Sequence, residues 1–491
     1  MKKILANPIF WLVIILIISF TVRLYKINNP IADWHSWRQA DTAAVSRNFY
    51  QEGYNPFIPK YDDMSGVAEH PVPNPNRYRF VEFPIYNSLV YFGYLINGGV
   101  NEAIARFVTV LISLGSLIFV YLITKRYFGV VTALIAAALF GFLPYNIYYS
   151  RVVLPDPFLV FSSLGMFYFL DRWIWENKRS QLILGLIFTA MAFLTKPMAI
   201  FFLLPLFYSY YQKEGRLWPI PKRYYSILLA FVPFLLWRFW INQHPEGIPA
   251  SKWLFNGTHI RFKPAFWKWI VGDRFGREIL GAAGTFLFVF GLLKKPFAKE
   301  GLLLHLLGLS SLLYLVVFAT GNVQHDYYQI LIVPALCIFV ARGAVLLFKG
   351  VEGFAPRLWT IPLAVLFLSL TIYLGWIEVK GLYQINNNAI IKAGMEANKI
   401  LPKDAVVLAP YQADTSFLYQ TNRHGIAYIY GSLTDTIKNY GVTALVSVAK
   451  DDKTAWAMKR FTVLEDAPEF VIVDLTKPNP NFDPLKNPEP Q

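Results

Sequence analysis

Apolar residues in this chain gather in long blocks that short polar connectors separate. A block of about 20 apolar residues is long enough for one helix to cross the hydrocarbon core of a bilayer. The pattern therefore predicts a polytopic α-helical membrane protein with eleven spans. These spans are expected near residues 8–27, 103–124, 129–148, 154–171, 181–195, 197–211, 224–242, 277–293, 301–320, 327–348 and 358–378.

The composition excludes an ordinary soluble protein. Of the 491 residues, 55% are hydrophobic and only 16% are charged, whereas soluble domains carry roughly 25% charged residues. The 17% share of aromatic residues also excludes a disordered or fibrous chain. Because Cys337 is the single cysteine, no intrachain disulfide forms and the cysteine content does not indicate a redox compartment.

The net charge of +15 comes from Lys and Arg side chains in the short connectors, not from one amphipathic face. This distribution favours the positive-inside rule and contact with the lipid bilayer over nucleic-acid binding. The basic start Met1-Lys2-Lys3 predicts a cytoplasmic N-terminus, and an odd number of spans then puts the C-terminus outside. The connectors expected in the cytoplasm are 125–126, 172–179, 213–223, 294–299 and 349–357, and the outer segments are 28–102, 243–276, 321–326 and the chain after about 380.

Three parts are expected along the chain. Residues 1–380 form the transmembrane module, which includes the first outer loop at 28–102. Residues 381–476 form a small extracytoplasmic α/β domain, and the proline-rich tail at 477–491 is expected to be extended or disordered. The helix and three strands expected in the α/β domain lie at 388–401, 405–409, 443–447 and 470–474.

The first outer loop holds the most informative polar cluster. From about Ser36 the loop has a helical pattern, and one face of that helix carries Arg38, Asp41, Thr42 and Val45. Two interpretations stay open. A carboxylate beside an arginine, framed by Trp34 and Trp37, suits acid–base chemistry on a polar substrate. The same residues also fit a structural Arg38–Asp41 ion pair on an interfacial helix.

Two further charged positions have both a structural and a functional interpretation. Asp156 stands between Pro155 and Pro157 where a helix begins, so it is either an N-cap or a second acidic group at the same membrane face as Asp41. Lys196 separates two apolar blocks. A lysine at membrane depth is costly and often functional, but near a hairpin tip it can also reach the interface.

The segment 322–329 brings His325 and Tyr328 to another outer helix start, where they line a sugar pocket or form an aromatic belt. Among the seven histidines, His35, His70 and His325 are the ones expected near the site. The chain lacks a Walker-type phosphate loop, a glycine-rich dinucleotide fingerprint, zinc-ligand spacing and a Gly-x-Ser-x-Gly elbow. Nucleotide-driven chemistry is therefore not expected.

Several short motifs follow one another in an order that resembles the C-type glycosyltransferase superfamily, in particular family 39. That family includes protein O-mannosyltransferases and the aminoarabinose transferases that modify lipid A. The resemblance covers roughly residues 8–380. Its marks are the acidic first loop, Glu82-Phe-Pro84-Ile-Tyr86, Asn101-Glu-Ala-Ile-Ala-Arg106, Ser150-Arg151 through Asp156-Pro157, and Leu194-Thr-Lys196-Pro197.

The resemblance implies an inverting transfer of a hexose or pentose from a polyprenyl-phosphate donor. The acceptor is a glycolipid, glycan or protein at the outer face of the bacterial inner membrane. Asp41 is then the catalytic base, with Asp33 in reserve, because strict alignment on the following helix puts the family's acidic pair nearer Arg38-Gln39. Asp156 matches the second acidic position.

The donor phosphate needs a cation, because this chain has Glu82-Phe83-Pro84 where relatives often carry Lys-Pro-Pro. The candidates are Arg38, Arg79, Arg151 and Lys196. The residues expected to line the substrate pocket are Asp33, His35, Trp37, Glu82, Tyr86, His325 and Tyr328. No cofactor and no metal ligand are expected, although a divalent ion held by Asp41 and Asp156 stays open, since other C-type enzymes use one.

Two other classes remain open. A transporter or flippase for a lipid-linked glycan also fits eleven spans and a basic cytoplasmic face. Large outer segments and the scarcity of charged residues deep within the spans count against it. A pseudoenzyme that scaffolds envelope assembly is the third hypothesis, and only the intact acidic positions argue against it. The transferred sugar and the acceptor cannot be read from the sequence.

Overall fold

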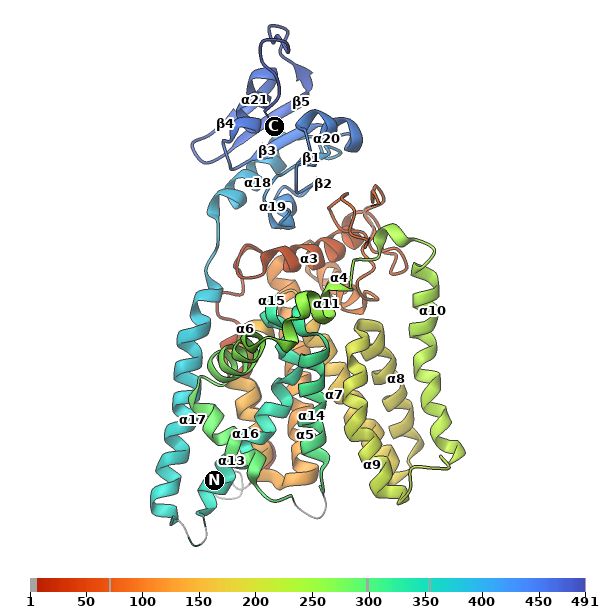
Figure 1. The fold of residues 1–491 in the computed structure, drawn as a ribbon, viewed down its shortest axis with the longest axis vertical. Coiled ribbons are helices and arrows are strands. Elements are labelled where there is room, and N and C mark those ends of the chain that lie inside the picture. Colours follow the sequence, from red (N-terminus) through yellow and green to blue (C-terminus); the bar gives the residue numbers. More distant parts are fainter. Residues whose placement is uncertain (1–6, 70–71, 297–299, 352, 354, 491) are drawn as a thin grey trace. The chain divides into compact units, whose positions relative to one another are not determined.

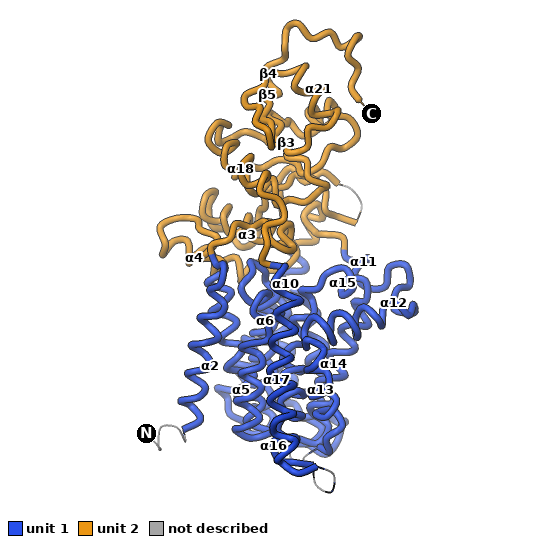
Figure 2. Tube along the Cα trace, turned by 90° about the vertical axis from the view of Figure 1, so that its left-hand side faces the viewer, with its two compact units in different colours: residues 1–27, 106–240, 251–382 blue, residues 28–105, 241–250, 383–491 orange. Residues whose placement is uncertain are grey.

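The computed structural model describes residues 7–69, 72–296, 300–351, 353 and 355–490. The chain divides into two compact units. We call residues 1–27, 106–240 and 251–382 the helical unit, and residues 28–105, 241–250 and 383–491 the mixed unit (Figure 2).

The helical unit consists of helices joined by short connections (Figure 1). Its first half contains α2 (Pro8–Arg23), α5 (Glu102–Phe142), α6 (Pro144–Tyr149), α7 (Asp156–Glu176), α8 (Arg179–Thr195), η1 (Pro197–Leu203), α9 (Leu204–Glu214), η2 (Lys222–Phe231) and α10 (Val232–Ile241). Its second half contains α11 (Trp253–Asn256), η4 (Gly257–Phe262), α12 (Pro264–Trp267), η5 (Lys268–Ile279), α13 (Ala283–Leu293), α14 (Leu303–Val317), α15 (Ala319–Gln324), η6 (Asp326–Ile332), α16 (Val333–Lys349) and α17 (Arg357–Val379).

Several of these helices are apolar enough to cross a membrane. Among the described residues, four segments have the length and hydropathy of a span, and a fifth is the bent pair Pro264–Ile279 and Ala283–Leu293. In Asp326–Lys349, 94% of the most apolar stretch is buried, against 22% in Lys222–Ile241. The first therefore belongs to the centre of the unit, and the second has the exposed apolar surface that a lipid-facing helix needs. The polytopic helical class agrees with this, while the count of eleven spans stays a prediction.

Close helix contacts depend on glycine. A Cβ on Gly291 of α13 would lie 1.8 Å from the carbonyl oxygen of Phe339 in α16, and a Cβ on Gly343 of α16 would lie 1.9 Å from that of Leu287. Only glycine lets the two backbones approach this closely. α13 itself begins after a 109° bend that follows η5, so the expected straight span at 277–293 includes the bend.

The mixed unit contains a five-stranded sheet in the order β2-β1-β3-β5-β4. β1 pairs in parallel with β2 and β3, whereas β5 pairs antiparallel with β3 and β4. The strands are β1 (Val407–Leu408), β2 (Gly425–Ile426), β3 (Ala444–Ser447), β4 (Phe461–Asp466) and β5 (Val471–Pro478). The helices are α3 (Ser36–Gln51), α4 (Ile85–Asn97), α18 (Asn388–Ile400), α19 (Thr415–Gln420), α20 (Leu433–Tyr440) and α21 (Asp452–Arg460), and a short turn is η3 (Pro245–Gly247). The turn η7 (Lys380–Tyr383) contains the boundary between the two units.

Some of these elements agree with the expected local structure. The helix expected at 388–401 overlaps α18, and the three expected strands overlap β1, β3 and β5, whereas β2, β4, α19, α20 and α21 were not expected. The end of the chain after β5 has turns and extended backbone, and its Asn487 carbonyl accepts a hydrogen bond from the Trp456 indole at 3.0 Å.

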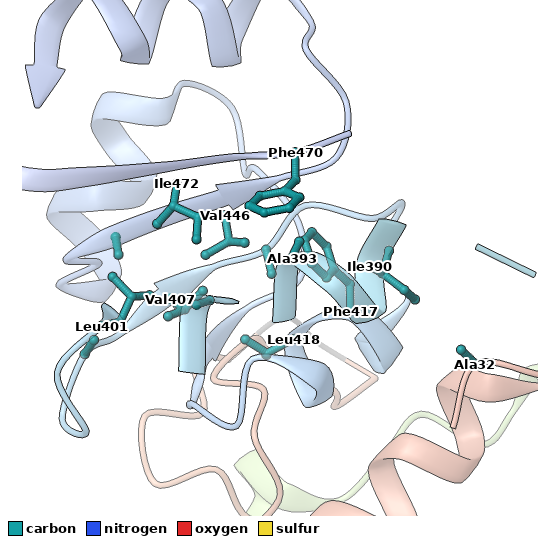
Figure 3. Close-up of a cluster of buried hydrophobic side chains, with 14 residues drawn as sticks. Ala32, Ile390, Ala393, Leu401, Val407, Phe417, Leu418, Val446, Phe470 and Ile472 are labelled. Atoms are coloured by element: carbon teal, nitrogen blue, oxygen red, sulfur yellow. The ribbon is translucent and has the colours of Figure 1, made fainter. Parts of the chain in front are cut away.

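One buried core joins the first loop to the C-terminal residues. Ala32 belongs to the same cluster as Phe417 and Leu418 of α19, Val446 of β3 and Ile472 of β5 (Figure 3). The structure thus groups residues 28–105 with 383–491 in one unit, whereas the sequence pattern assigns them to separate parts. Long-range packing of small and apolar side chains accounts for the grouping, and local periodicity does not reveal it.

Candidate active site

The helix α3 carries the first acidic candidate. It begins at Ser36, as expected, after His35 in the left-handed region with φ 54°. Although its sequence is polar, most of its side chains are buried within the mixed unit. Their polar groups find partners there: Asn87 Nδ2, for example, donates to the Thr42 carbonyl at 2.7 Å. α3 is therefore an internal helix of the mixed unit.

Both carboxylate oxygens of Asp41 have a defined partner. Arg79 Nη2 donates to Oδ2 at 2.6 Å, and Thr415 Oγ1 donates to Oδ1 at 2.7 Å. The side chain is 4% exposed. Two charge-assisted hydrogen bonds of this length fix the orientation of a carboxylate and leave lone pairs for a further donor.

The structural interpretation of an Arg38–Asp41 ion pair is wrong. Arg38 Nη2 lies 3.1 Å from both oxygens of Glu82, while Asp41 pairs with Arg79. The two α3 side chains therefore have separate partners outside the helix. A planar guanidinium facing two carboxylate oxygens has better geometry than a neighbour along one helix.

Two more acids lie in the electrostatic environment of Asp41. Burial raises the pKa of Asp63 to about 6, and the charge of Asp41 adds to that rise, while hydrogen bonds from Ser65 oppose it. Burial likewise raises the pKa of Asp414, again with a contribution from Asp41. Asp41 thus lies near two acids whose pKa is raised, next to the cation Arg79.

The other first-loop candidates are also in the mixed unit. Asp33 accepts a hydrogen bond from Gln39 Nε2 at 2.7 Å, and the His35 ring packs edge-on against Trp34 at 5.1 Å. The Trp37 carbonyl lies 3.2 Å from Thr415 Oγ1. Tyr86 is buried and donates to the Ala105 carbonyl at 3.4 Å. His70 lies outside the described residues.

In the helical unit, Asp156 is the first residue of α7 and is not an N-cap. The N-cap position belongs to Pro155, and no side chain caps this helix. Lys196 Nζ instead donates to Asp156 Oδ1 at 2.6 Å. Asp156 Oδ2 is buried, and no donor to it occurs among the described residues. The capping interpretation is therefore wrong, and one oxygen of this carboxylate lacks a hydrogen-bond donor among the described residues.

Lys196 does not reach the surface of its unit. It is 7% exposed, and its ammonium lies 4.9 Å from the centre of the Tyr328 ring. The His325 ring packs against the Tyr328 ring at 5.7 Å. The helical unit thus gathers the expected residues Asp156, Lys196, Tyr328 and His325 in one place.

Arg151 is the remaining cation in this group of candidates. It is completely buried, donates to the Lys26 carbonyl at 2.9 Å and lies 5.5 Å from the Tyr148 ring.

No group of three or more His, Cys, Asp or Glu side chains within the described ranges is arranged to hold a metal ion. At Asp41 the positive charge comes from Arg79. The expectations about cofactors and metals stay predictions.

Sequence reasoning missed Thr415 and Asp63. Thr415 lies 374 residues from Asp41 along the chain, and a single threonine in a short helix has no local signal for such a contact. Asp63 follows Asp62 in a loop of irregular backbone, where periodicity gives no information about burial.

Comparisons with known proteins identify a family match for part of the chain. Residues 82–240 match the family model of the dolichyl-phosphate-mannose-protein mannosyltransferases, and both Asp156 and Lys196 lie inside the match. No curated protein matches the chain by sequence.

Solved structures match over nearly the whole chain. ArnT from Cupriavidus metallidurans bound to undecaprenyl phosphate has a TM-score of 0.64 at 16% identity, covering 94% of this chain and 97% of that one. The Archaeoglobus fulgidus oligosaccharyltransferase complexed with zinc and sulfate has a TM-score of 0.57 at 12% identity, covering 91% and 69%.

The mycobacterial arabinofuranosyltransferase AftD has a TM-score of 0.54 at 11% identity, covering 95% of this chain and 40% of that one. All three are C-type glycosyltransferases. The resemblance in the sequence is therefore confirmed: the chain has the fold of the C-type glycosyltransferases, and its residues 82–240 match the dolichyl-phosphate-mannose-protein mannosyltransferase family.

Proposed function

We propose that this protein is an inverting glycosyltransferase that moves a sugar from a polyprenyl-phosphate donor to a hydroxyl group of an envelope acceptor. The observation that carries the proposal is the buried carboxylate of Asp41, oriented through both oxygens by Arg79 and Thr415. This carboxylate belongs to a chain with the C-type glycosyltransferase fold. The structural relative from Cupriavidus metallidurans binds undecaprenyl phosphate, which supports a polyprenyl-phosphate donor here.

The chemistry is a single displacement. The acceptor oxygen attacks the anomeric carbon, the bond from that carbon to the phosphate oxygen breaks, and the electron pair leaves with the polyprenyl phosphate. The acceptor proton passes to Asp41, which acts as general base. Such assistance contributes typically ~10²–10⁴-fold to the rate. One displacement at the anomeric carbon inverts its configuration.

The leaving phosphate gains negative charge, so a cation beside it stabilises the transition state. Arg151 and Lys196 lie inside the region that matches the family model. Arg151 is completely buried, whereas Lys196 keeps 7% of its surface exposed. We therefore favour Lys196, with Arg38, Arg79 and Arg151 as the other candidates. We propose that Asp156 Oδ2, which has no donor among the described residues, accepts a hydrogen bond from a sugar hydroxyl, and no step of this scheme uses a metal ion.

The proposal places the protein in the bacterial cytoplasmic membrane. The basic connectors at 125–126, 172–179 and 213–223 face the cytoplasm under the positive-inside rule. The mixed unit then lies on the outer side, together with Asp41. A polyprenyl-phosphate donor suits this location because it needs no nucleotide supply there.

A single-compartment assay separates this function from transport of a lipid-linked glycan. Purified full-length protein in detergent is incubated with crude membrane acceptor and the undecaprenyl-phosphate esters of mannose, glucose, galactose and arabinose. Release of undecaprenyl phosphate together with a glycosylated product is the expected result. Translocation of a donor in proteoliposomes, without its consumption in detergent, would establish a flippase instead.

The phosphate contact has its own test, which uses undecaprenyl phosphate as the probe. Lys196→Gln removes the positive charge but keeps a donor for Asp156. We expect binding of undecaprenyl phosphate to weaken roughly tenfold or more, the scale of a hydrogen bond to a charged group. Lys178→Gln, at a lysine that is 63% exposed, is the matched control. Equal binding by both variants would exclude Lys196 as the phosphate ligand.

A further inference from the structure

The short helix α19 carries the contact between the C-terminal part of the chain and the proposed base, Asp41. Thr415 is the first residue of α19, and its hydroxyl lies 2.7 Å from Asp41 Oδ1. The same hydroxyl lies 3.2 Å from the Trp37 carbonyl. A threonine hydroxyl has a single proton to donate, so the shorter contact to the charged oxygen is the stronger one.

Further contacts join α19 to first-loop residues that precede and follow Asp41 in the chain. Arg47 of α3 donates to the Tyr419 carbonyl at 2.9 Å, and its guanidinium lies 4.4 Å from the centre of the Tyr419 ring. Gln420 Nε2 donates to the Ile31 carbonyl at 3.0 Å. Phe417 and Leu418 of the same helix pack into the core that contains Ala32. These contacts hold Thr415 in register with Asp41.

Backbone hydrogen bonds also join the sheet to the first loop. The Gly425 amide of β2 donates to the Asp62 carbonyl at 3.0 Å, and the Met64 amide donates to the Gly425 carbonyl at 2.8 Å. Asn386 adds a backbone hydrogen bond to the Ala32 carbonyl at 2.8 Å. The C-terminal residues therefore form part of the structure that supports the first-loop carboxylate.

We propose that Thr415 is a positioning residue for Asp41, so that the C-terminal part of the chain orients the carboxylate that accepts the acceptor proton. This inference rests on the proposed function. Arg79 fixes one oxygen, and Thr415 fixes the other. Without the second contact the carboxylate can rotate about its terminal torsion, which is broad for Asp. Its alignment with the acceptor hydroxyl is then lost for part of the time.

The test compares three variants of the full-length protein in the donor assay. Thr415→Val keeps the shape but removes the hydroxyl, and we expect kcat to fall about tenfold with the donor KM unchanged. Thr415→Ser restores the hydroxyl and is expected to recover most of the rate. Ser416→Ala is the matched control. Ser416 follows Thr415 in the chain, and its buried hydroxyl has no hydrogen-bond partner among the described residues.

The split between kcat and KM separates positioning from a general structural defect. In Thr415→Val only kcat should fall, while Thr415→Ser and Ser416→Ala keep both kcat and the donor KM near the wild-type values. If Thr415→Val does not fold, Thr415→Ala and Thr415→Ser give the same comparison.

The outcomes distinguish this inference from the proposed function. An inactive Asp41→Asn variant together with a wild-type kcat in Thr415→Val would overturn the positioning role alone. An Asp41→Asn variant with the wild-type rate would overturn the assignment of the base, and the positioning role with it. Loss of activity in Thr415→Val that Thr415→Ser does not restore would assign Thr415 to packing.

Discussion

Several of the buried charged side chains are held in pairs of opposite sign, such as Asp41 with Arg79 and Asp156 with Lys196. A pair of this kind costs little more than an apolar pair of the same volume, whereas removal of one partner leaves a buried charge and costs about 3–5 kcal/mol. Neutral substitutions that keep a hydrogen bond, such as Asp to Asn, are therefore the informative ones at these positions.

Asp63 gives the stability of the mixed unit a defined pH dependence. Its pKa rises to about 6 through burial, so the folded state binds the proton more tightly than the unfolded state does. The contribution of Asp63 is fully present below about pH 4 and is lost as the pH rises through about 6. Two pKa units correspond to about 3 kcal/mol.

Asp63→Asn should remove that dependence. Thermal unfolding in detergent at pH 4.5, 6 and 7.5 is expected to show a smaller loss of stability with rising pH in the variant than in the wild type. Asp404→Asn, at an exposed position, should follow the wild-type trend. Parallel curves for Asp63→Asn and the wild type would contradict the raised pKa.

The sequence identified the charges of the site but not their partners. Asp41 and Asp156 were accessible to reasoning because each stands in a recognisable motif. Their partners Arg79, Thr415 and Lys196 lie 38 to 374 residues away along the chain. Helical periodicity reports only neighbours three or four residues apart, which is why the incorrect pairing of Arg38 with Asp41 was one of the two interpretations that it left open.

At the scale of elements, the crossing of α13 and α16 depends on the absence of two side chains. A Cβ on Gly343 would lie 1.9 Å from a backbone oxygen of α13, and backbone atoms cannot move aside as a flexible side chain does. Overpacking typically costs 1–3 kcal/mol.

We expect Gly343→Ala to destabilise the protein by about 2 kcal/mol, measured as a lower temperature of thermal unfolding in detergent. Gly272→Ala is the control, because a Cβ there meets no atom within 4 Å. An unfolding temperature for Gly343→Ala equal to that of the control would show that the two helices separate at little cost.

Elements with a strong pattern were predictable, and weakly patterned ones were not. The helix from Ser36 and the strands β3 and β5 follow clear periodicity or apolar runs. β2 has only two residues, and β4 ends in Leu-Glu-Asp, which hides its alternation. Gly129, with φ 81°, interrupts α5, in agreement with the sequence boundary between the two spans expected there.

At the scale of the whole molecule, the grouping of the first loop with the C-terminal residues in one unit could not be predicted from the sequence. It rests on contacts such as that of Ala32 with the α19 core, between residues that are distant along the chain. The proposed orientation in the membrane, by contrast, rests on charge counts alone and is open to direct measurement.

Cysteine labelling tests that orientation. The native Cys337 is completely buried, so it should not react with a membrane-impermeant maleimide. We expect Lys403→Cys to be labelled in intact spheroplasts, and Lys178→Cys to be labelled only after lysis. The reverse pattern would place the mixed unit in the cytoplasm and contradict an extracytoplasmic site.

The central claim is that Asp41 accepts the proton in a sugar transfer from a polyprenyl-phosphate donor. The most direct measurement is transfer of radiolabelled sugar from undecaprenyl-phosphate donors to membrane acceptor by purified wild-type protein and by Asp41→Asn, with Asp404→Asn as the control. The account predicts transfer by the wild type and the control, and a loss of ~10²–10⁴-fold in Asp41→Asn. Transfer by folded Asp41→Asn at the wild-type rate would contradict it.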